Sequence, residues 1–233
     1  MILFGGDSHT WGQGLEWELL LQSENWNVDR INNIIPPRHA NENLPLFLNQ
    51  YRETNRWIHQ VSKYFNYGYD LFRCGNGGGN PNTYFGMEHL DHLVIPENVN
   101  LIVVQFTQSG RGAPEDFDLS ETGDIFQDDI NQFLKTVRII KERYPWINII
   151  TLSWLHETGQ LVEKYLGEEY VVKHNTWDYK VGFETWLNKN NLANKHQGLQ
   201  DYHMSQEQHN EMAKIVINHI EKYNLLQKNN ISV

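Results

Sequence analysis

A serine near the start of the chain and an Asp-x-His motif near its end are the residues whose types suit nucleophilic chemistry. Ser8 follows Gly5-Gly6-Asp7, and Asp201 and His203 lie two residues apart. A carboxylate that holds one imidazole nitrogen leaves the other to take a proton from a serine hydroxyl, which is otherwise a weak nucleophile. These residues predict a Ser-His-Asp arrangement if the fold brings the two ends of the chain together.

The residues around Ser8 are typical of a turn between a strand and a helix. Residues 2–4 are apolar, and the two glycines after them allow a sharp turn. Ser8 then lies where a helix is expected to begin, and free N–H groups and the helix dipole favour developing negative charge there. A serine in this position also suits a simple N-cap, and that role stays open.

A glycine-rich segment follows the second expected strand, at residues 75–82. So many glycines cost conformational entropy, and they are useful where the backbone must present an N–H group to a ligand. A flexible turn is the alternative. The glycine spacing does not fit a dinucleotide-binding fingerprint.

Polar residues follow the third expected strand. Thr107 and Gln108 are each suited to donate a side-chain hydrogen bond into the same crevice, and Arg111 is suited to bind an anionic or polyhydroxylated substrate. A surface salt bridge is an equally good role for Arg111. In an open α/β sheet the ligand crevice lies beyond the carboxyl ends of the strands, so we expect these segments to meet there.

The elements that must position these residues alternate between short β-rich runs and amphipathic helical windows, as in a parallel sheet with helices on both faces. We expect a three-layer α/β/α sandwich whose mostly parallel central sheet has about five strands. The expected strands are residues 2–4, 69–74, 101–106 and 147–152, with a fifth around 169–172.

Apolar residues at helical spacing predict helices around residues 57–65, 130–137 and 212–223. Thr54 is expected to cap the first helix, and Ser205 with Gln208 is expected to form a capping box on the last.

Composition excludes several classes of function. The formal charge of -10 argues against a nucleic-acid partner. No stretch approaches the about 20 apolar residues of a membrane helix, and the N-terminal residues do not fit a signal peptide. We therefore expect a cytoplasmic protein with no membrane contact. The histidines show no metal-ligand spacing, so no metal and no other cofactor is expected.

In block order, residues 6–216 resemble the SGNH hydrolases, also called GDSL-like esterases and lipases. Gly6-Asp7-Ser8 resembles the first block of that family. Residues 79–82 are similar to the Gly-x-x-Asn of the second block, with Gly78 as a rival for its glycine. Asp201-x-His203 looks like the last block.

The resemblance implies a flavodoxin-like fold. The chain length favours a single domain over residues 1–233, and an Asn-rich stretch that contains Pro36-Pro37 predicts a loop-rich insertion around residues 23–50. The resemblance implies that Ser8 is the nucleophile, that His203 is the base and that Asp201 is the partner of His203. The backbone of Ser8 itself would donate to the oxyanion.

The resemblance also assigns the substrate side of the site. Gly79 would supply a second backbone donor, and Asn82 would bind the oxyanion or the substrate. Thr107 or Gln108 stands where the family's third block has an asparagine, which implies an altered oxyanion hole. The last block is one residue shorter than the usual Asp-x-x-His, a variant seen in divergent, often viral, members.

The resulting expectation is a serine esterase that hydrolyses carboxylic esters, with short acyl or O-acetyl groups, carried by a carbohydrate, as the favoured substrates. Aromatic residues expected near the crevice suit sugar rings, although they suit a core as well; they are Trp11, Tyr84, Trp154, Trp177 and Trp186. The alternative is a catalytically weak or inactive binding or structural module of a larger assembly, such as a virion. The sequence does not specify an oligomeric state.

Overall fold

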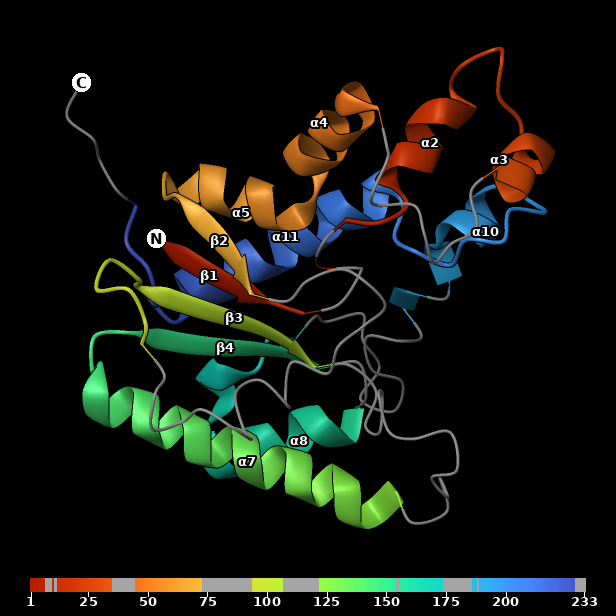
Figure 1. Ribbon diagram of the computed structural model, residues 1–233. Coiled ribbons are helices and arrows are strands. Elements are labelled where there is room, and N and C mark those ends of the chain that lie inside the picture. The colour runs from red at the N-terminus through yellow and green to blue at the C-terminus, as the bar shows by residue number, and fades with distance from the viewer. Residues whose placement is uncertain are drawn as a thin grey trace, which may run out of the picture.

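The computed structural model describes residues 1–6, 10, 12–34, 45–72, 94–106, 122–153, 156–173, 186–187 and 189–228. Within these ranges, parallel strands form one sheet in the order β2-β1-β3-β4 (Figure 1). The strands are β1 (Ile2–Gly5), β2 (Tyr69–Phe72), β3 (Leu101–Phe106) and β4 (Asn148–Ser153). Strand β1 is central, because Ile2 pairs with Tyr69 on one side and with Leu101 on the other.

Strand β3 has a nearly continuous apolar sequence, as is typical of a parallel strand that is covered on both faces. Leu101 and Val103 face one hydrophobic cluster, whereas Ile102 and Val104 face another. All four side chains are fully buried or nearly so. The alternation of side chains along β3 therefore divides the core into two halves, one on each face of the sheet.

Helices cover both faces of the sheet (Figure 1). Helices α5 (Trp57–Phe65) and α11 (Gln206–Lys222) pack on one face through residues that include Ile58, Val61 and Val216. Helices α7 (Thr122–Arg143) and α8 (His156–Leu166) pack on the other through Phe133, Val137 and Val162. The expected three-layer α/β/α sandwich is confirmed.

A third, smaller cluster lies beyond the carboxyl ends of the strands, where Figure 1 shows α2, α3 and α10. These helices are α2 (Leu15–Leu21), α3 (Val28–Ile34), α4 (Leu46–Asn55) and α10 (Leu192–Lys195). Apolar side chains from all four helices and the chain just after α10 bury one another there: Trp17, Leu20, Ile31, Leu48, Leu192 and Leu199. The described parts of residues 23–50 thus include α3 and the first half of α4.

Two local expectations are wrong. At the place of the expected fifth strand, Glu168–Tyr170 form a 3-10 helix (η3), and only an isolated bridge joins Val171 to Thr151. Thr54 does not cap α5, since it lies inside α4, where its hydroxyl donates to the carbonyl oxygen of Gln50 at 2.9 Å. The break between the two helices falls at Arg56, whose backbone is extended.

The expected capping box is confirmed at the start of α11. The Ser205 hydroxyl accepts a hydrogen bond from the Gln208 backbone N–H, and the Gln208 side chain accepts one from the Ser205 N–H. The helix is thereby fixed at its first turn, two residues after His203.

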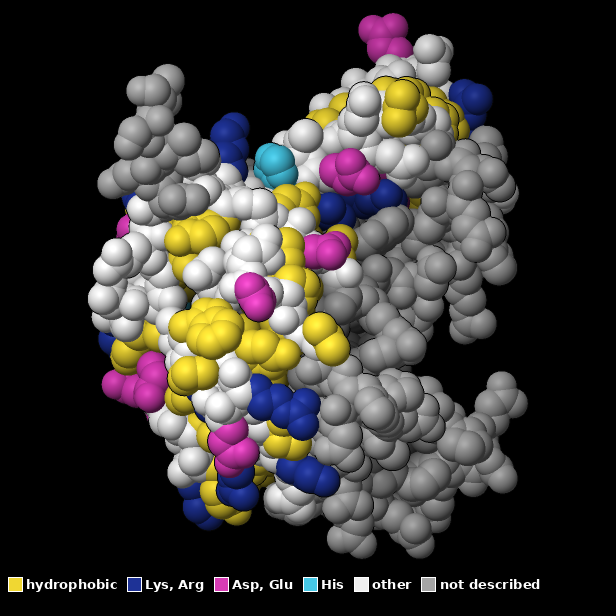
Figure 2. Space-filling view, turned by 60° about the vertical axis from the view of Figure 1, so that its left-hand side comes forward, with side chains coloured by type: hydrophobic (Ala, Val, Ile, Leu, Met, Phe, Trp, Pro, Cys, Tyr) yellow, Lys and Arg dark blue, Asp and Glu magenta, His cyan; other side chains and the backbone are white. Residues whose placement is uncertain are grey.

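The face shown in Figure 2 carries interspersed acidic and basic side chains among its described residues, with no continuous basic surface. This distribution agrees with the acidic composition of the chain. Among the described helices, none has the length and apolar character needed to cross a membrane.

Candidate active site

Of the predicted site residues, the structure describes Asp201 and His203 and brings them together. The others lie outside the described residues: Ser8, Gly79, Asn82, Thr107, Gln108 and Arg111. Their assignments remain predictions. Trp186, expected near the crevice, is buried in the core under α11.

Asp201 and His203 form a compact pair in the loop before α11. One carboxylate oxygen of Asp201, Oδ1, lies 2.6 Å from Nδ1 of the His203 ring and also accepts the His203 backbone N–H at 2.8 Å. A side-chain oxygen that accepts the N–H two residues further on is the geometry of an Asx turn. The Asp-x-His spacing therefore suffices to orient the ring, without the extra residue of the usual family motif.

The pair has the electrostatics of a general base and its partner. Burial raises the pKa of the Asp201 carboxyl, but the charge of His203, the two hydrogen bonds from His203 and one from Trp17 outweigh burial and lower that pKa below 3.8. Asp201 is thus ionised at neutral pH. A proton on Nδ1 is then held by the carboxylate, and the basic lone pair of the ring is on Nε2.

The exposure of the two side chains differs in the way that proton transfer requires. The Asp201 side chain is 4% exposed, whereas that of His203 is 17% exposed. The carboxylate is therefore shielded from water, while one edge of the imidazole reaches the surface of the described part of the chain.

The residues that flank Ser8 lie at the carboxyl end of β3. The Thr10 hydroxyl donates to the side-chain oxygen of Gln105, which is buried near the end of that strand. A Cβ on Gly6 would lie 3.0 Å from Cβ of Gln105 and 2.8 Å from Cβ of Thr10, so only glycine allows this close approach. The segment before Ser8 and the segment after it are both fixed to the same strand end.

Further along the same segment, Gly14 reaches the Asp-His pair. Its φ of 101° is in the left-handed region, and a Cβ placed on it would contact the side chains of Leu192, His203 and Asp201. The N-terminal segment and the C-terminal loop therefore meet at this point, six residues after Ser8.

A buried carboxyl group lies next to this contact. Glu16, in the first turn of α2, has no exposed side-chain surface, and its Oε1 lies 3.7 Å from Nη1 of Arg52 in α4. Burial raises the pKa of Glu16 to about 7, although Arg52 opposes the rise; Asp201 adds to the rise and His203 opposes it. The pKa of Glu16 therefore depends on the charges of Asp201 and His203, and it lies near neutral pH.

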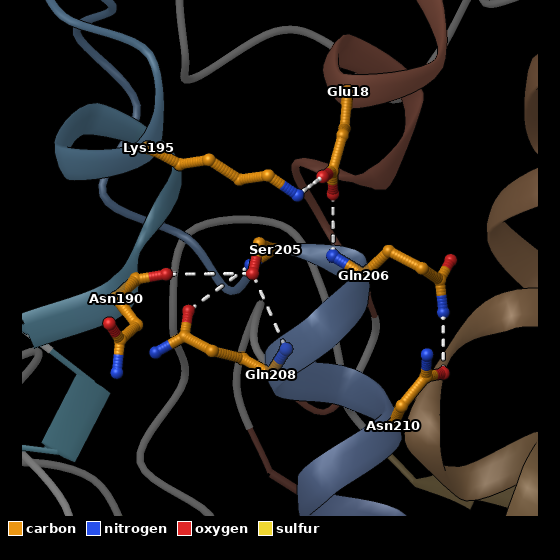
Figure 3. Close-up of polar contacts among 7 residues, drawn as sticks. All are labelled: Glu18, Asn190, Lys195, Ser205, Gln206, Gln208 and Asn210. Atoms are coloured by element: carbon orange, nitrogen blue, oxygen red, sulfur yellow. Dashed lines mark hydrogen bonds and ion pairs between the residues drawn. The ribbon is translucent and has the colours of Figure 1, made fainter.

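A second buried carboxylate, Glu18, joins three elements (Figure 3). One carboxylate oxygen of Glu18 contacts the ammonium group of Lys195 in α10, and the other accepts the backbone N–H of Gln206 at 2.5 Å. Gln206 is the first residue of α11, so a negative charge lies at the positive end of that helix. The loop that carries Asp201 and His203 lies between these two contacts.

A buried histidine completes the surroundings. His209, in α11, is fully buried, and its Nδ1 accepts the backbone N–H of Trp57 at 3.3 Å. Burial, together with the charges of His203 and Arg56, lowers the pKa of His209 to about 3. His209 is neutral at physiological pH and acts as a hydrogen-bond acceptor in the core.

Glu16, Glu18, Arg52 and Lys195 are not among the site residues predicted from the sequence. One signal points to the two glutamates: residues 15–21 read Leu-Glu-Trp-Glu-Leu-Leu-Leu, an apolar helix with acidic residues inside it. Acidic residues are almost never fully buried without a partner, so their placement in such a run implies buried partners elsewhere in the chain. The identity of those partners depends on the tertiary fold.

No group of three or more His, Cys, Asp or Glu side chains among the described residues is arranged to hold a metal ion.

No family model and no curated protein matches the chain. Solved structures do, and two of them are a carbohydrate esterase whose active site is described as having divergent catalytic and non-catalytic binding functions, and a family two carbohydrate esterase from Clostridium thermocellum in complex with cellohexaose. The identity is 12% to each, and the TM-scores are 0.50 and 0.47. The aligned regions cover 95% and 97% of this chain but 64% and 65% of those structures. At this identity the first similarity shows the fold alone: the chain shares the α/β fold of that carbohydrate esterase.

Proposed function

We propose that the protein is a serine esterase in which Ser8 is the nucleophile, His203 is the general base and Asp201 orients and stabilises His203. The observation that carries the proposal is the Asp201–His203 pair, with the carboxylate on Nδ1 at 2.6 Å. The contact of Gly14 with His203 supports it, because it brings the segment that contains Ser8 to the same place.

In the proposed reaction, the Ser8 Oγ attacks the ester carbonyl carbon while Nε2 of His203 takes the hydroxyl proton. The tetrahedral intermediate collapses as the bond to the leaving oxygen breaks, and His203 returns the proton to the departing alcohol. A water molecule then attacks the acyl-serine, again with His203 as base, and releases the carboxylic acid. Asp201 stays ionised throughout and stabilises the imidazolium.

The oxyanion would be bound by the backbone N–H groups of Ser8 and Gly79, with Thr107 or Gln108 as a third donor and Asn82 beside them. Removal of one such donor typically lowers kcat by about 100- to 1,000-fold. An enzyme with a substituted third donor is therefore expected to be slow but measurable.

For the substrate, we propose short acyl esters, O-acetyl groups in particular, on carbohydrates, with Arg111 contacting the polar alcohol portion. The support is the fold shared with a carbohydrate esterase. A viral-type member of the superfamily has no support from that similarity.

The test of the mechanism is covalent labelling of Ser8 together with turnover. A fluorophosphonate should label the wild type and not Ser8→Ala, with the modified peptide containing residue 8. Hydrolysis of p-nitrophenyl acetate and of acetylated sugars should be lost in both Ser8→Ala and His203→Ala. Turnover that survives both substitutions would exclude this mechanism.

A non-catalytic binding module is the second candidate, and the observation that favours it is the presence of Thr107 and Gln108 where the SGNH family has an asparagine. This candidate predicts that wild-type protein binds an acetylated oligosaccharide in calorimetry, leaves its acetyl groups in place and does not react with the fluorophosphonate. Labelling of Ser8 excludes it.

A further inference from the structure

Glu18 makes buried contacts that have no role in the proposed catalytic steps. Its side chain is 4% exposed. Of its two carboxylate oxygens, one pairs with Lys195 at the end of α10 and the other accepts the N–H of Gln206 at the start of α11 (Figure 3). A buried carboxylate with two such partners is well satisfied, and it is costly to disturb.

The two partners of Glu18 bracket the loop that carries Asp201 and His203. The loop leaves α10 after Lys195 and enters α11 at Gln206. Within the loop, the His203 carbonyl oxygen accepts the backbone N–H of Leu192, the first residue of α10, at 3.0 Å. Both ends of the loop and the backbone of His203 are therefore fixed to elements that contact Glu18.

Glu18 belongs to α2, the helix that follows the predicted nucleophile. One turn earlier, Gly14 precedes this helix and contacts the His203 side chain. The start of α2 is thus close to the Asp-His loop at two places: its N-cap residue Gly14 lies against the loop's side chains, and Glu18 contacts residues at the two ends of the loop.

We infer that Glu18 is a positioning residue, whose carboxylate fixes the loop carrying Asp201 and His203 to the helix that follows Ser8. The inference rests on the proposed function, because the loop that Glu18 fixes carries the proposed base, His203. Proton transfer requires hydrogen-bond reach, and a displacement of about 1 Å can lower the rate by about 100-fold.

The test compares Glu18→Leu, Glu18→Gln and Lys195→Met with the wild type. Leu removes both acceptors, Gln keeps one oxygen for the Gln206 N–H, and Met removes only the ammonium partner. We expect Glu18→Leu to lower kcat for p-nitrophenyl acetate by about 100-fold with little change in KM. Glu18→Gln should recover most of that loss, and Lys195→Met should lose less than Glu18→Leu.

The matched control is Glu163→Gln, which breaks another acidic–basic pair, Glu163–Lys173, outside the cluster formed by α2, α10 and the start of α11. It should leave kcat unchanged. All rates are referred to the amount of folded protein, so that loss of stability is counted separately. If Glu18→Leu melts at a lower temperature but keeps the wild-type kcat per folded molecule, Glu18 is only a structural residue and the inference is wrong.

A spectroscopic measurement separates this inference from the proposed function. The ring ¹⁵N and ¹H resonances of His203 report its contact with Asp201 whether or not the protein turns over an ester. We expect them to shift or broaden in Glu18→Leu and to stay in place in Glu163→Gln. A wild type that neither hydrolyses nor labels would refute the esterase, whereas unchanged His203 resonances in Glu18→Leu would refute the positioning role.

Discussion

Gly14 and His203, 189 residues apart in the chain, are in such close contact that a Cβ on the glycine would lie 2.9 Å from the Cβ of the histidine. Real Cβ atoms essentially never lie this close to a neighbouring carbon atom. A side chain on residue 14 would therefore force one of the two segments to shift. The contact joins the start of α2 to the loop before α11, and four predictions concern the residues around it.

The first prediction is that Gly14→Ala is destabilising and slows the reaction. Its φ of 101° is unfavourable for alanine, and the new methyl group would press on Leu192 and His203. Backbone strain of this kind costs about 1–3 kcal/mol. Urea unfolding and ester hydrolysis measure the two effects. Gly68→Ala is the control, because a Cβ there meets no atom within 4 Å. Equal behaviour of the two variants would contradict the prediction.

The second prediction is that Asp201→Asn abolishes most of the activity without unfolding the protein. An amide does not hold Nδ1–H in place or stabilise the imidazolium as a carboxylate does, and the corresponding change in the triad of a serine protease lowers kcat by roughly 10,000-fold. Esterase assays with circular dichroism of the variant are the measurement. Asp29→Asn, on the surface of α3, should be fully active. Asp201→Asn with activity within tenfold of the wild type would exclude Asp201 from the mechanism.

The third prediction concerns Glu16, whose pKa is raised from 4.5 to about 7. Between these values the unfolded chain has lost the Glu16 proton and the folded protein has kept it, so the folded state binds more protons and its stability falls as pH rises. Relative to Glu16→Gln, the wild type should lose roughly 3 kcal/mol of unfolding free energy as pH rises from 4.5 through the folded-state pKa to about pH 8. Urea titrations across this range measure it, and a difference that does not vary with pH would refute it.

The fourth prediction concerns His209 and has the opposite sign. Its pKa is lowered from 6.5 to about 3, so the unfolded chain binds the proton first as pH falls and the folded state loses stability. Relative to His209→Gln, which keeps an acceptor for the Trp57 N–H, the wild type should lose roughly 3 kcal/mol by pH 4. The same urea titrations suffice. Because the Glu16 and His209 variants should diverge from the wild type at opposite ends of the pH range, each serves as the control for the other.

Features that depend on local sequence could be predicted. The run at residues 101–106 reads as a buried strand because parallel strands are apolar on both faces, and it forms β3 with the same limits. The capping box of Ser205 and Gln208 could also be read directly, since both partners lie within one helical turn.

Where the outcome depends on tertiary contacts, local reading failed. Residues 169–172 look like a strand, but Glu168–Tyr170 turn as a 3-10 helix and leave a single bridge at Val171. Thr54 suits a cap, yet α4 continues past it, and the boundary between α4 and α5 lies at Arg56, where the backbone is extended. The partner of Glu16 also could not be predicted from local sequence, because Arg52 is more than thirty residues away in the chain.

The shortened Asp-x-His motif can also be explained only from the structure. In sequence, the missing residue looks like a loss of reach between the carboxylate and the ring. In the folded loop, a single oxygen of Asp201 serves both the backbone N–H and Nδ1 of His203. The turn that the short motif forms therefore also fixes the orientation of the His203 ring.

The contact between Glu18 and Gln206 joins residues that are 188 positions apart. A chain that grows from its N-terminus on the ribosome therefore makes Glu18 long before it makes any of the partners that satisfy it. Until α10 and α11 have emerged, that carboxylate has only water to solvate it, and the start of α2 has no loop to pack against. The residues of the Asp-His pair are thus among the last to be synthesised, and no N-terminal fragment that ends before residue 201 contains them.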